Sequence, residues 1–325
     1  MAHRKIQDEI EHLAQLCRSE SGPAAVAALR KALGDRVNLM VAKAAKLAGE
    51  QRRLELVPEL LAAFDRLMEE PVERDPQCWG KNAIASALVA LEYRFSAPFQ
   101  RGARHVQIEP SHLRPADTAA TLRGICLLAL PGCSDLRREE VLGCLVDALM
   151  EEEHTVRMEA VRAIALMEGS EAALLLRLKA RVGDEESAVT GQVFDSLMRL
   201  EGAGALPFVG SFLRSRKEES REEAALALGA SRLAGAVEIL REALGAAREP
   251  QFRDVLMRAL SASRQPAAIE YLLELFRNGR AADSAAALSA LELHRETPAI
   301  WQMVQAAMDS KASRGWRPEP AGRKL

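Results

Sequence analysis

Aromatic residues are scarce in this sequence of 325 residues, where phenylalanine, tyrosine and tryptophan together make up only 4%. Aromatic and β-branched side chains normally fill the cores of β-sandwiches and barrels, so their scarcity disfavours an all-β fold. Neither sign of charge dominates, because 44 lysines and arginines face 46 aspartates and glutamates, for a net charge of −2. This balance excludes a polybasic chromatin-type protein and a protein driven by a strongly acidic tail.

Long apolar runs are also missing. The longest, from Ile125 to Leu130, is far shorter than the roughly 18 apolar residues that span a bilayer. Charged residues interrupt the N-terminus from Arg4 onward, so no signal-peptide core is expected. The five cysteines are scattered and odd in number, which is typical of free thiols in a reducing compartment. We therefore expect a soluble cytoplasmic protein without a membrane segment.

Motifs of familiar chemistry are missing as well. The chain contains no P-loop, dinucleotide-binding, nucleophile-elbow or Cys-x-x-Cys motif. Four residues of ligand type lie near one another in the sequence, but their spacing matches no zinc pattern: His105, His112, Cys126 and Cys133. No catalytic residue, metal or other cofactor is predicted, although the absence of a motif does not exclude enzymatic activity.

The sequence does contain a repeat of 31–33 residues. A dipeptide of a small residue followed by an aliphatic residue recurs along the chain. Apolar residues stand three and four positions before each aliphatic residue, and this spacing places the apolar residues and the aliphatic residue on one face of an α-helix. The five clearest copies are Ala163-Ile164, Ser196-Leu197, Ala227-Leu228, Ala259-Leu260 and Ala290-Leu291. The small first member predicts that two helices approach closely at this point.

A second apolar series lies between these helices, so each repeat contains two helices. Its members begin at Leu206, Val237, Ile269 and Ile300, and Pro266 and Pro298 stand where a first-turn proline is tolerated. Less regular copies of the first series precede these repeats at Ala44-Ala45, Ala87-Leu88 and Gly124-Ile125.

One helix pair cannot bury its apolar face alone, whereas a stack of pairs can. The predicted fold is all-α, a right-handed α-solenoid of about eight helix pairs, with first helices on the convex side and second helices on the concave side. An irregular helical bundle is the alternative. We expect an N-terminal capping helix in residues 1–20, the repeats in 21–309 with an irregular insertion at 93–116, and a flexible basic tail at 310–325.

Two of the second helices, residues 154–164 and 251–260, resemble HEAT repeats. More narrowly, they are similar to the short bacterial HEAT-like repeats of the phycobilisome-lyase type, whose second helix reads x-V-R-x-x-A-x-x-A-L. The resemblance implies an armadillo-like helical fold and, in most members, a protein–protein scaffold. Enzymes of the di-iron hydroxylase type use His-Glu dipeptides as ligands, and here Glu11-His12 and Glu153-His154 run in the reverse order.

Bilin lyases of this family have no compact signature to compare. HEAT-like DNA glycosylases need a basic concave surface, whereas five arginines and five acidic residues balance at the exposed positions of the clearest second helices. Nucleic acid is therefore disfavoured as a partner. The recurrent Arg157, Arg221 and Arg253 are predicted to form ion pairs or hydrogen bonds between repeats, in preference to ligand contacts.

Residues 93–116 break the repeat with three prolines, one glycine and four arginines against one glutamate. Two interpretations stay open: a recognition loop that grips an acidic or peptide partner, or a degenerate repeat whose aromatic residues plug the stack and whose arginines are solvated. Trp79, at the start of the preceding helix, either shapes a pocket with this loop or, by preference, covers the seam between repeats. The candidate partner-binding residues are Trp79, Arg94, Phe99, Arg101, Arg104, His105, His112 and Arg114.

The resulting hypothesis is a non-enzymatic HEAT-like scaffold that binds a protein or peptide partner through its concave face and the 93–116 loop. The alternatives are a modifying enzyme of the bilin-lyase type and a HEAT-like DNA-repair protein.

Overall fold

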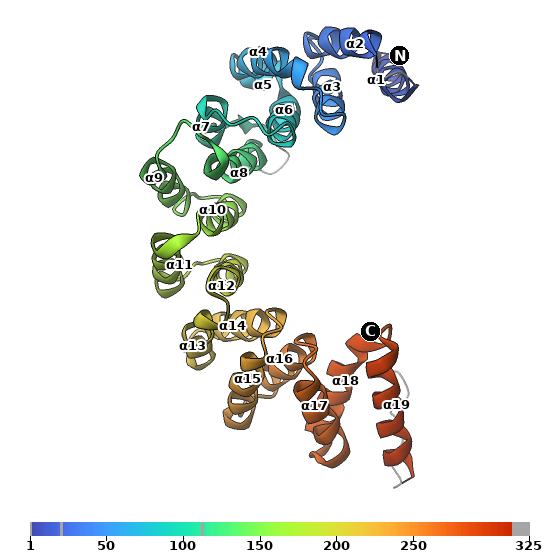
Figure 1. The fold of residues 1–325 in the computed structure, drawn as a ribbon, viewed down its shortest axis with the longest axis vertical. Coiled ribbons are helices and arrows are strands. Elements are labelled where there is room, and N and C mark those ends of the chain that lie inside the picture. The colour runs from blue at the N-terminus through green and yellow to red at the C-terminus, as the bar shows by residue number, and fades with distance from the viewer. Residues whose placement is uncertain (1, 20–21, 112–113, 314–325) are drawn as a thin grey trace. The chain divides into compact units, whose positions relative to one another are not determined.

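The computed structural model describes residues 2–19, 22–111 and 114–313, with side chains from residue 6 onward. Helices dominate the described residues, and the strands found there are two residues long. The chain divides into two compact units, an N-terminal unit of Met1–Ala172 and a C-terminal unit of Ala173–Leu325. Each unit is built from consecutive helix pairs (Figure 1).

In the N-terminal unit, α1 (Ala2–Ser19) precedes the helix pairs. These are α2 (Pro23–Leu33) with α3 (Asn38–Glu50), α4 (Val57–Met68) with α6 (Trp79–Ala90), α7 (Ala97–Ala103) with α8 (Ala120–Ala129), and α9 (Arg138–Ala148) with α10 (His154–Leu166). Shorter elements connect them: η1 (Leu54–Leu56), α5 (Pro71–Arg74), η2 (Pro76–Cys78), β1 (Ile108–Glu109), β2 (Ala116–Asp117) and η3 (Leu130–Gly132). The two strands are antiparallel, with Ile108 opposite Asp117 and Glu109 opposite Ala116.

The boundary between the units falls inside α11 (Gly169–Val182), which α12 (Ser187–Glu201) follows in sequence. The C-terminal unit continues with α13 (Leu206–Ser211) and α14 (Glu218–Ala230), α15 (Ala234–Ala246) and α16 (Pro250–Ala262), α17 (Pro266–Asn278) and α18 (Ala281–Leu291), and finally α19 (Pro298–Ala312). The connecting 3-10 segments are η4 (Gly202–Ala205), η5 (Phe212–Arg214) and η6 (Glu292–His294).

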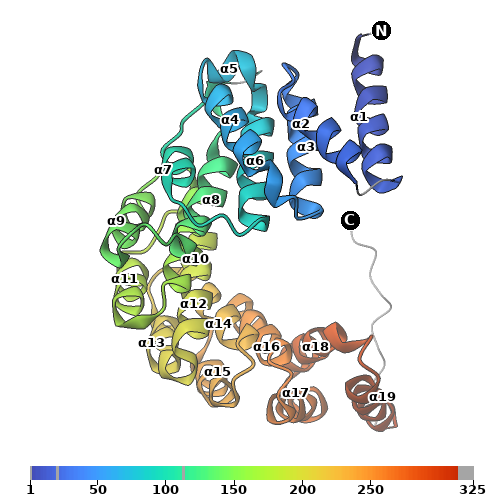
Figure 2. The same ribbon diagram turned by 45° about the horizontal axis from the view of Figure 1, so that its top comes forward.

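Second helices pack on second helices within each unit. In the N-terminal unit α3, α6, α8 and α10 form one continuous layer, and in the C-terminal unit α12, α14, α16 and α18 do the same (Figure 2). First helices form the other layer, for example α2 beside α4 and α13 beside α15. The predicted all-α solenoid of stacked helix pairs is therefore confirmed, and the described residues contain the expected number of about eight pairs.

The core lies between the two layers, and the predicted repeat supplies it. The aliphatic member of each clear dipeptide has no exposed surface: Ile164, Leu197, Leu228, Leu260 and Leu291. Burying a side chain of this size contributes about 1.5–3 kcal/mol to folding. Pro266 and Pro298 are the first residues of α17 and α19, as predicted, where the missing N–H of proline leaves no helical hydrogen bond unmade.

Small residues allow second helices to approach closely. A Cβ atom added at Gly229 of α14 would lie 2.3 Å from the main-chain oxygen of Ala259 in α16, and one added at Gly49 of α3 would lie 3.1 Å from the Cα of Ala87 in α6. Both alanines are small members of predicted dipeptides. The predicted close approach is therefore confirmed at Ala87 and Ala259.

Two segments differ from the expected outline. Residues 93–116 are more regular than predicted, because they contain α7, which occupies a first-helix position, and strand β1 of the hairpin. At the other end, α19 continues to Ala312, so residues 310–312 of the predicted tail are helical, while residues 314–325 lie outside the described chain. Helix α1 occupies the place of the expected capping helix.

Candidate partner-binding groove

The start of α6 is fixed by a buried carboxylate. Asp75 has no exposed surface, and its side chain accepts hydrogen bonds from the main-chain N–H groups of Gly80 (2.7 Å) and Lys81 (2.9 Å). These are N–H groups of the first helical turn, which has no partner within the helix. Gln77 and Cys78 just before them have φ of +63° and +57°, so the chain turns sharply into α6. The carboxylate therefore compensates for a strained entry to this helix.

Lys81 pairs with this carboxylate in the interior. Its Nζ lies 3.3 Å from Asp75 Oδ2 and donates to the main-chain oxygen of Leu67 at 3.2 Å, and both charged side chains are fully buried. A buried charge is tolerated when it is paired and hydrogen-bonded. Asn38 of α3 donates to the other carboxylate oxygen at 3.0 Å. The network thus joins α3, α4 and α6.

The β1–β2 hairpin is attached to the same point through Glu109. Its carboxylate accepts hydrogen bonds from Gln77 N (2.7 Å), Gln77 Nε2 (3.1 Å), Gln107 Nε2 (2.6 Å) and Thr118 Oγ1 (2.6 Å). Burial acts to raise the pKa of Glu109, but these hydrogen bonds to the ionised form outweigh it and lower the pKa below its usual value. The hairpin therefore holds the residue two positions before Trp79.

A second buried pair fixes the other end of the hairpin. Arg123 of α8 is 1% exposed, and its Nη1 donates to Asp117 Oδ2 at 2.6 Å and to the main-chain oxygen of His105 at 3.0 Å. Burial acts to raise the pKa of Asp117, while hydrogen bonds from the main chain of Ala119 and Gln107 and from Arg123 lower it overall. Residues 105–109 and 116–119 are therefore bound to the helix layer by internal polar contacts.

Beside this support, α3, α6 and α8 form an open apolar groove of about 580 Å³, here named the Trp79 groove. Small or aliphatic residues line its floor, and Trp79 is 50% exposed at the start of α6. The polar lining is sparse, and Lys46 and Glu50 within it form an ion pair at 3.8 Å. The lining residues are Lys46, Gly49, Glu50, Trp79, Asn82, Ala83, Ser86, Ala87, Ala90, Thr121 and Ile125.

The structure separates the residues that the sequence grouped around Trp79. Arg101, Arg104 and His105 line a different groove of about 480 Å³ with Met68, Ala97 and Gln100, on α4 and α7 of the first-helix layer. Trp79 lies on the second-helix layer. A single pocket that combines Trp79 with these arginines is therefore not formed.

Phe99 requires a correction. It is 1% exposed and packs beside Tyr93, with ring centroids 6.3 Å apart, so it belongs to the core and has no surface to offer to a partner. Arg94 and Arg114 are exposed, as a partner contact requires. His112 lies outside the described residues.

The arginines of the α7 groove already have neighbours. Arg101 forms an ion pair with Asp65, and Arg104 Nη2 lies 3.9 Å from Cys144 Sγ. Burial lowers the pKa of His105, and its hydrogen-bond contact with Gln107 only partly offsets this. Arg101 and Arg104 nevertheless remain exposed, whereas His105 is half-buried.

Sequence reasoning associated Trp79 with the 93–116 loop or the seam between repeats and missed the other residues of the groove. The signal was present on the exposed face of α6, where Trp79, Ala83, Ser86 and Ala90 follow one another at helical spacing. Small residues on that face leave space for a partner, as Gly49 and Ala87 do where α3 meets α6.

Cysteines and metal ligands give no further site. Cys17, Cys78, Cys126 and Cys133 are buried free thiols, and burial raises the pKa of Cys78 to about 12. In residues 2–19, 22–111 and 114–313, no group of three or more His, Cys, Asp or Glu side chains is placed to hold a metal ion. None of the helices in these ranges combines the length and apolar character needed to cross a membrane.

The fold places this chain among helical-repeat proteins of the α-solenoid type. No family model matches the sequence, and no curated protein matches it. Among solved structures, human deoxyhypusine hydroxylase in complex with glycerol matches at 21% identity over 79% of this chain and 90% of that chain, with a TM-score of 0.30. The complex of CpcE and CpcF of phycocyanin lyase from Nostoc sp. PCC7120 matches at 18% identity over 90% and 97%, with a TM-score of 0.32. Likenesses of this strength carry no ligand or activity over to the present chain.

Proposed function

We propose that this protein is a non-enzymatic helical-repeat scaffold that binds a protein or peptide partner on the second-helix face of its N-terminal unit. The observation that carries the proposal is the half-exposed Trp79 at the edge of a groove with a floor of Gly, Ala and Ile side chains. Tryptophan is the residue type most enriched at the centres of protein interfaces. Leaving it exposed beside an apolar groove favours a partner that covers both.

The energetic gain from covering Trp79 is sufficient to anchor a complex. The exposed half of a tryptophan corresponds to an area on the order of 120 Å², which is worth about 3 kcal/mol at the usual coefficient for apolar burial. A loss of that size weakens binding by a factor of about 100.

The 93–116 segment has a positioning role in this proposal. Glu109 holds Gln77, and Asp75 holds the first turn of α6, so Trp79 projects from a rigid support. Pre-organised contact residues improve affinity because less conformational entropy is lost on binding. Arg101 and Arg104 lie on the other layer, so a partner uses them only if it extends around the edge of the repeat.

Site-specific photo-crosslinking followed by titration tests the proposal. A photo-reactive phenylalanine at Ser86, inside the groove, is expected to capture a partner that the same residue at Leu54 does not, since Leu54 is 63% exposed in the same unit but outside the groove. The purified partner is then titrated calorimetrically. We expect Trp79→Ala to raise Kd about 100-fold and the matched Leu54→Ala to leave it unchanged. Equal capture at both positions, or an unchanged Kd for Trp79→Ala, contradicts the groove.

The alternatives from the sequence make different predictions. A modifying enzyme of the bilin-lyase type retains a coloured tetrapyrrole after incubation and gel filtration, with visible absorbance that co-elutes with the protein. A DNA-repair protein retards duplex DNA in a mobility-shift assay at low salt, where phosphate contacts are strongest. We expect neither result.

A further inference from the structure

Four second helices carry a cation near their start, and in three of them it has the same structural task. Lys81, Arg157 and Arg253 stand seven residues before the aliphatic member of their dipeptides. Each donates to main-chain oxygens at or just after the end of the preceding first helix: Leu67 for Lys81, Glu151 and Glu152 for Arg157, and Leu244 and Ala247 for Arg253. Orphan carbonyl groups at helix ends need such donors.

Arg221 occupies the same position in α14 and departs from this rule. Its guanidinium makes a bidentate ion pair with Glu249, with Nη2 2.6 Å from Oε2, and its Cζ lies 5.0 Å from the centroid of the Phe252 ring. Within the described residues, Arg221 donates no hydrogen bond to a main-chain oxygen, and its Nε has no partner. In place of the usual contact, a cavity of about 350 Å³ opens beside η5.

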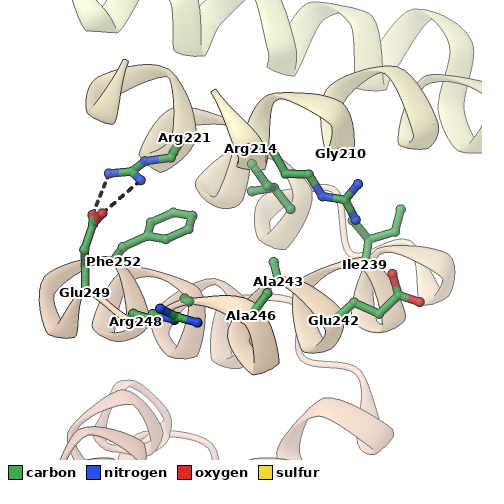
Figure 3. Close-up of a pocket in the computed structure, with 12 residues that line it drawn as sticks. Gly210, Arg214, Arg221, Ile239, Glu242, Ala243, Ala246, Arg248, Glu249 and Phe252 are labelled. Atoms are coloured by element: carbon green, nitrogen blue, oxygen red, sulfur yellow. Dashed lines mark hydrogen bonds and ion pairs between the residues drawn. The ribbon is translucent and has the colours of Figure 1, made fainter. Parts of the chain in front are cut away.

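The cavity lies within the C-terminal unit and combines an apolar wall with arginines (Figure 3). Arg221 and Glu249 face each other at one end above Phe252, while Arg214 extends across the upper side and Arg248 lies along the lower side. Leu213, Ile239, Ala243, Ala246, Ala247 and Gly210 supply the apolar lining. The arrangement offers charged groups at the rim and a hydrophobic interior.

The charges around the cavity are not balanced. Arg214, Arg221 and Arg248 face Glu242 and Glu249, which leaves one net positive charge. Glu249 is already neutralised by Arg221, whereas neither Arg214 nor Arg248 has a carboxylate within ion-pair distance in the described part of the unit. Both are exposed, so their guanidinium groups are free to turn toward a ligand. A ligand with a single negative charge would balance the net positive charge of this rim. A dianion such as phosphate would be repelled by the two glutamates.

We infer that this cavity binds a monocarboxylate attached to an aromatic or aliphatic body, with the carboxylate between Arg214 and Arg248 and the apolar body against Phe252 and Ile239. Guanidinium groups match carboxylates geometrically, and the cavity volume lies in the range of small-molecule sites. The ligand is either a free carboxylic acid or the C-terminus of a peptide with an apolar last residue. The inference is independent of the Trp79 groove, which lies in the other unit.

Calorimetric titration of the full chain with 3-phenylpropanoate, and with a pentapeptide that ends in phenylalanine, tests the inference. We expect saturable binding of at least one probe, weakened about tenfold by Arg214→Gln and by Arg248→Gln, since each removes one charge-assisted hydrogen bond. Arg216→Gln is the matched control, because it removes the same charge two residues from Arg214 without lining the cavity. Ala246→Phe, which fills the cavity without changing charge, is expected to abolish binding.

Three results overturn the inference: no saturable binding of either probe at millimolar concentration, binding that survives Arg214→Gln, Arg248→Gln and Ala246→Phe, or equal binding of the amidated peptide and of 3-phenylpropanamide. Stronger binding of the free peptide than of 3-phenylpropanoate assigns the site to a peptide C-terminus, and the reverse order assigns it to a small acid. Circular dichroism confirms that each variant is folded. Trp79→Ala is expected to leave these affinities unchanged, which separates this site from the proposed function.

Discussion

At the scale of single residues, the recurrent arginines of the second helices form hydrogen bonds and ion pairs within the protein. Arg221 bonds to Glu249 and Arg253 to Asp283, in each case the next repeat, and Arg157 bonds to main-chain oxygens of its own turn. The predicted bonding between repeats is found for Arg221 and Arg253, whereas Arg157 donates to main-chain oxygens within its own repeat.

His294 is the residue whose titration couples most directly to stability. It is 2% exposed, and its Nε2 lies 3.0 Å from both the hydroxyl and the main-chain oxygen of Ser261. The Ser261 hydroxyl itself donates to Ala290 O, so Nε2 is assigned as the protonated nitrogen of the neutral ring. A second proton must then go to Nδ1, which is buried without a partner in the described chain. Burial, aided by Arg264, accordingly lowers the pKa of His294.

We predict that stability falls with acidity through this residue. Because the folded-state pKa lies below the unfolded value of about 6.5, the unfolded chain takes up a proton that the folded chain refuses, and stability declines as the pH drops below about 6.5. His294→Gln, which keeps a donor for Ser261 but cannot titrate, should cost about 1–2 kcal/mol at pH 7.5 and show a shallower decline toward pH 5. Urea unfolding at both pH values measures the difference, and parallel declines in the two proteins would contradict the assignment.

At the scale of the helices, close approach between neighbouring second helices is the feature most sensitive to side-chain size. The position of Gly229 in α14 is filled by the backbone of Ala259 in α16, only 2.3 Å from where a Cβ would lie. Main-chain atoms in a packed helix cannot move aside as a flexible side chain does. The helices would therefore have to separate to admit even a methyl group.

We predict opposite effects for two glycine-to-alanine substitutions in adjacent helices. Gly229→Ala should destabilise the protein by about 1–3 kcal/mol through overpacking. Gly245→Ala in α15, where nothing lies within 4 Å of the added Cβ, should stabilise it by about 0.5–1 kcal/mol because alanine is the better helix former. Thermal unfolding of both variants provides the measurement. A neutral Gly229→Ala would show that α14 and α16 are less tightly packed than described.

At the scale of the whole chain, each helix pair makes its main contacts with the pairs next to it. The second helices pack in the order of the sequence, α3 on α6, α6 on α8 and α8 on α10, and likewise α12 on α14, α14 on α16 and α16 on α18. Stability in such an array is approximately a sum of local terms and nearest-neighbour terms. Damage at one pair should therefore remain local.

Hydrogen exchange tests this expectation. In Gly229→Ala, the amides of α14 and α16 should exchange faster, with a smaller effect on α12 and α18, while the amides of α3 and α6 in the N-terminal unit keep their protection. Mass spectrometry of peptides resolves these helices. A uniform loss of protection across both units would instead indicate that the chain unfolds as one cooperative block.

How much could be predicted differs between fold and site. The small–aliphatic dipeptides identified the helix pairs, the buried aliphatic positions and the close approaches at Ala87 and Ala259, because these depend on spacing along one helix face. The site was harder to predict. Phe99 was a candidate partner-binding residue and is in the core, as the degenerate-repeat interpretation allowed, since composition alone does not tell which side of a short helix faces inward.

The sequence by itself determined that this protein is a stack of helix pairs, because a small–aliphatic dipeptide repeated on one helical face can be buried only against a neighbour of the same kind. Only the tertiary structure decided that Trp79 and the arginines of α7 face different grooves, and that Arg221 leaves a cavity where its counterparts bind carbonyl groups. The layer on which a side chain lies, and the cavity beside Arg221, both depend on contacts between residues some 30 positions apart. No periodicity within a single helix encodes those contacts.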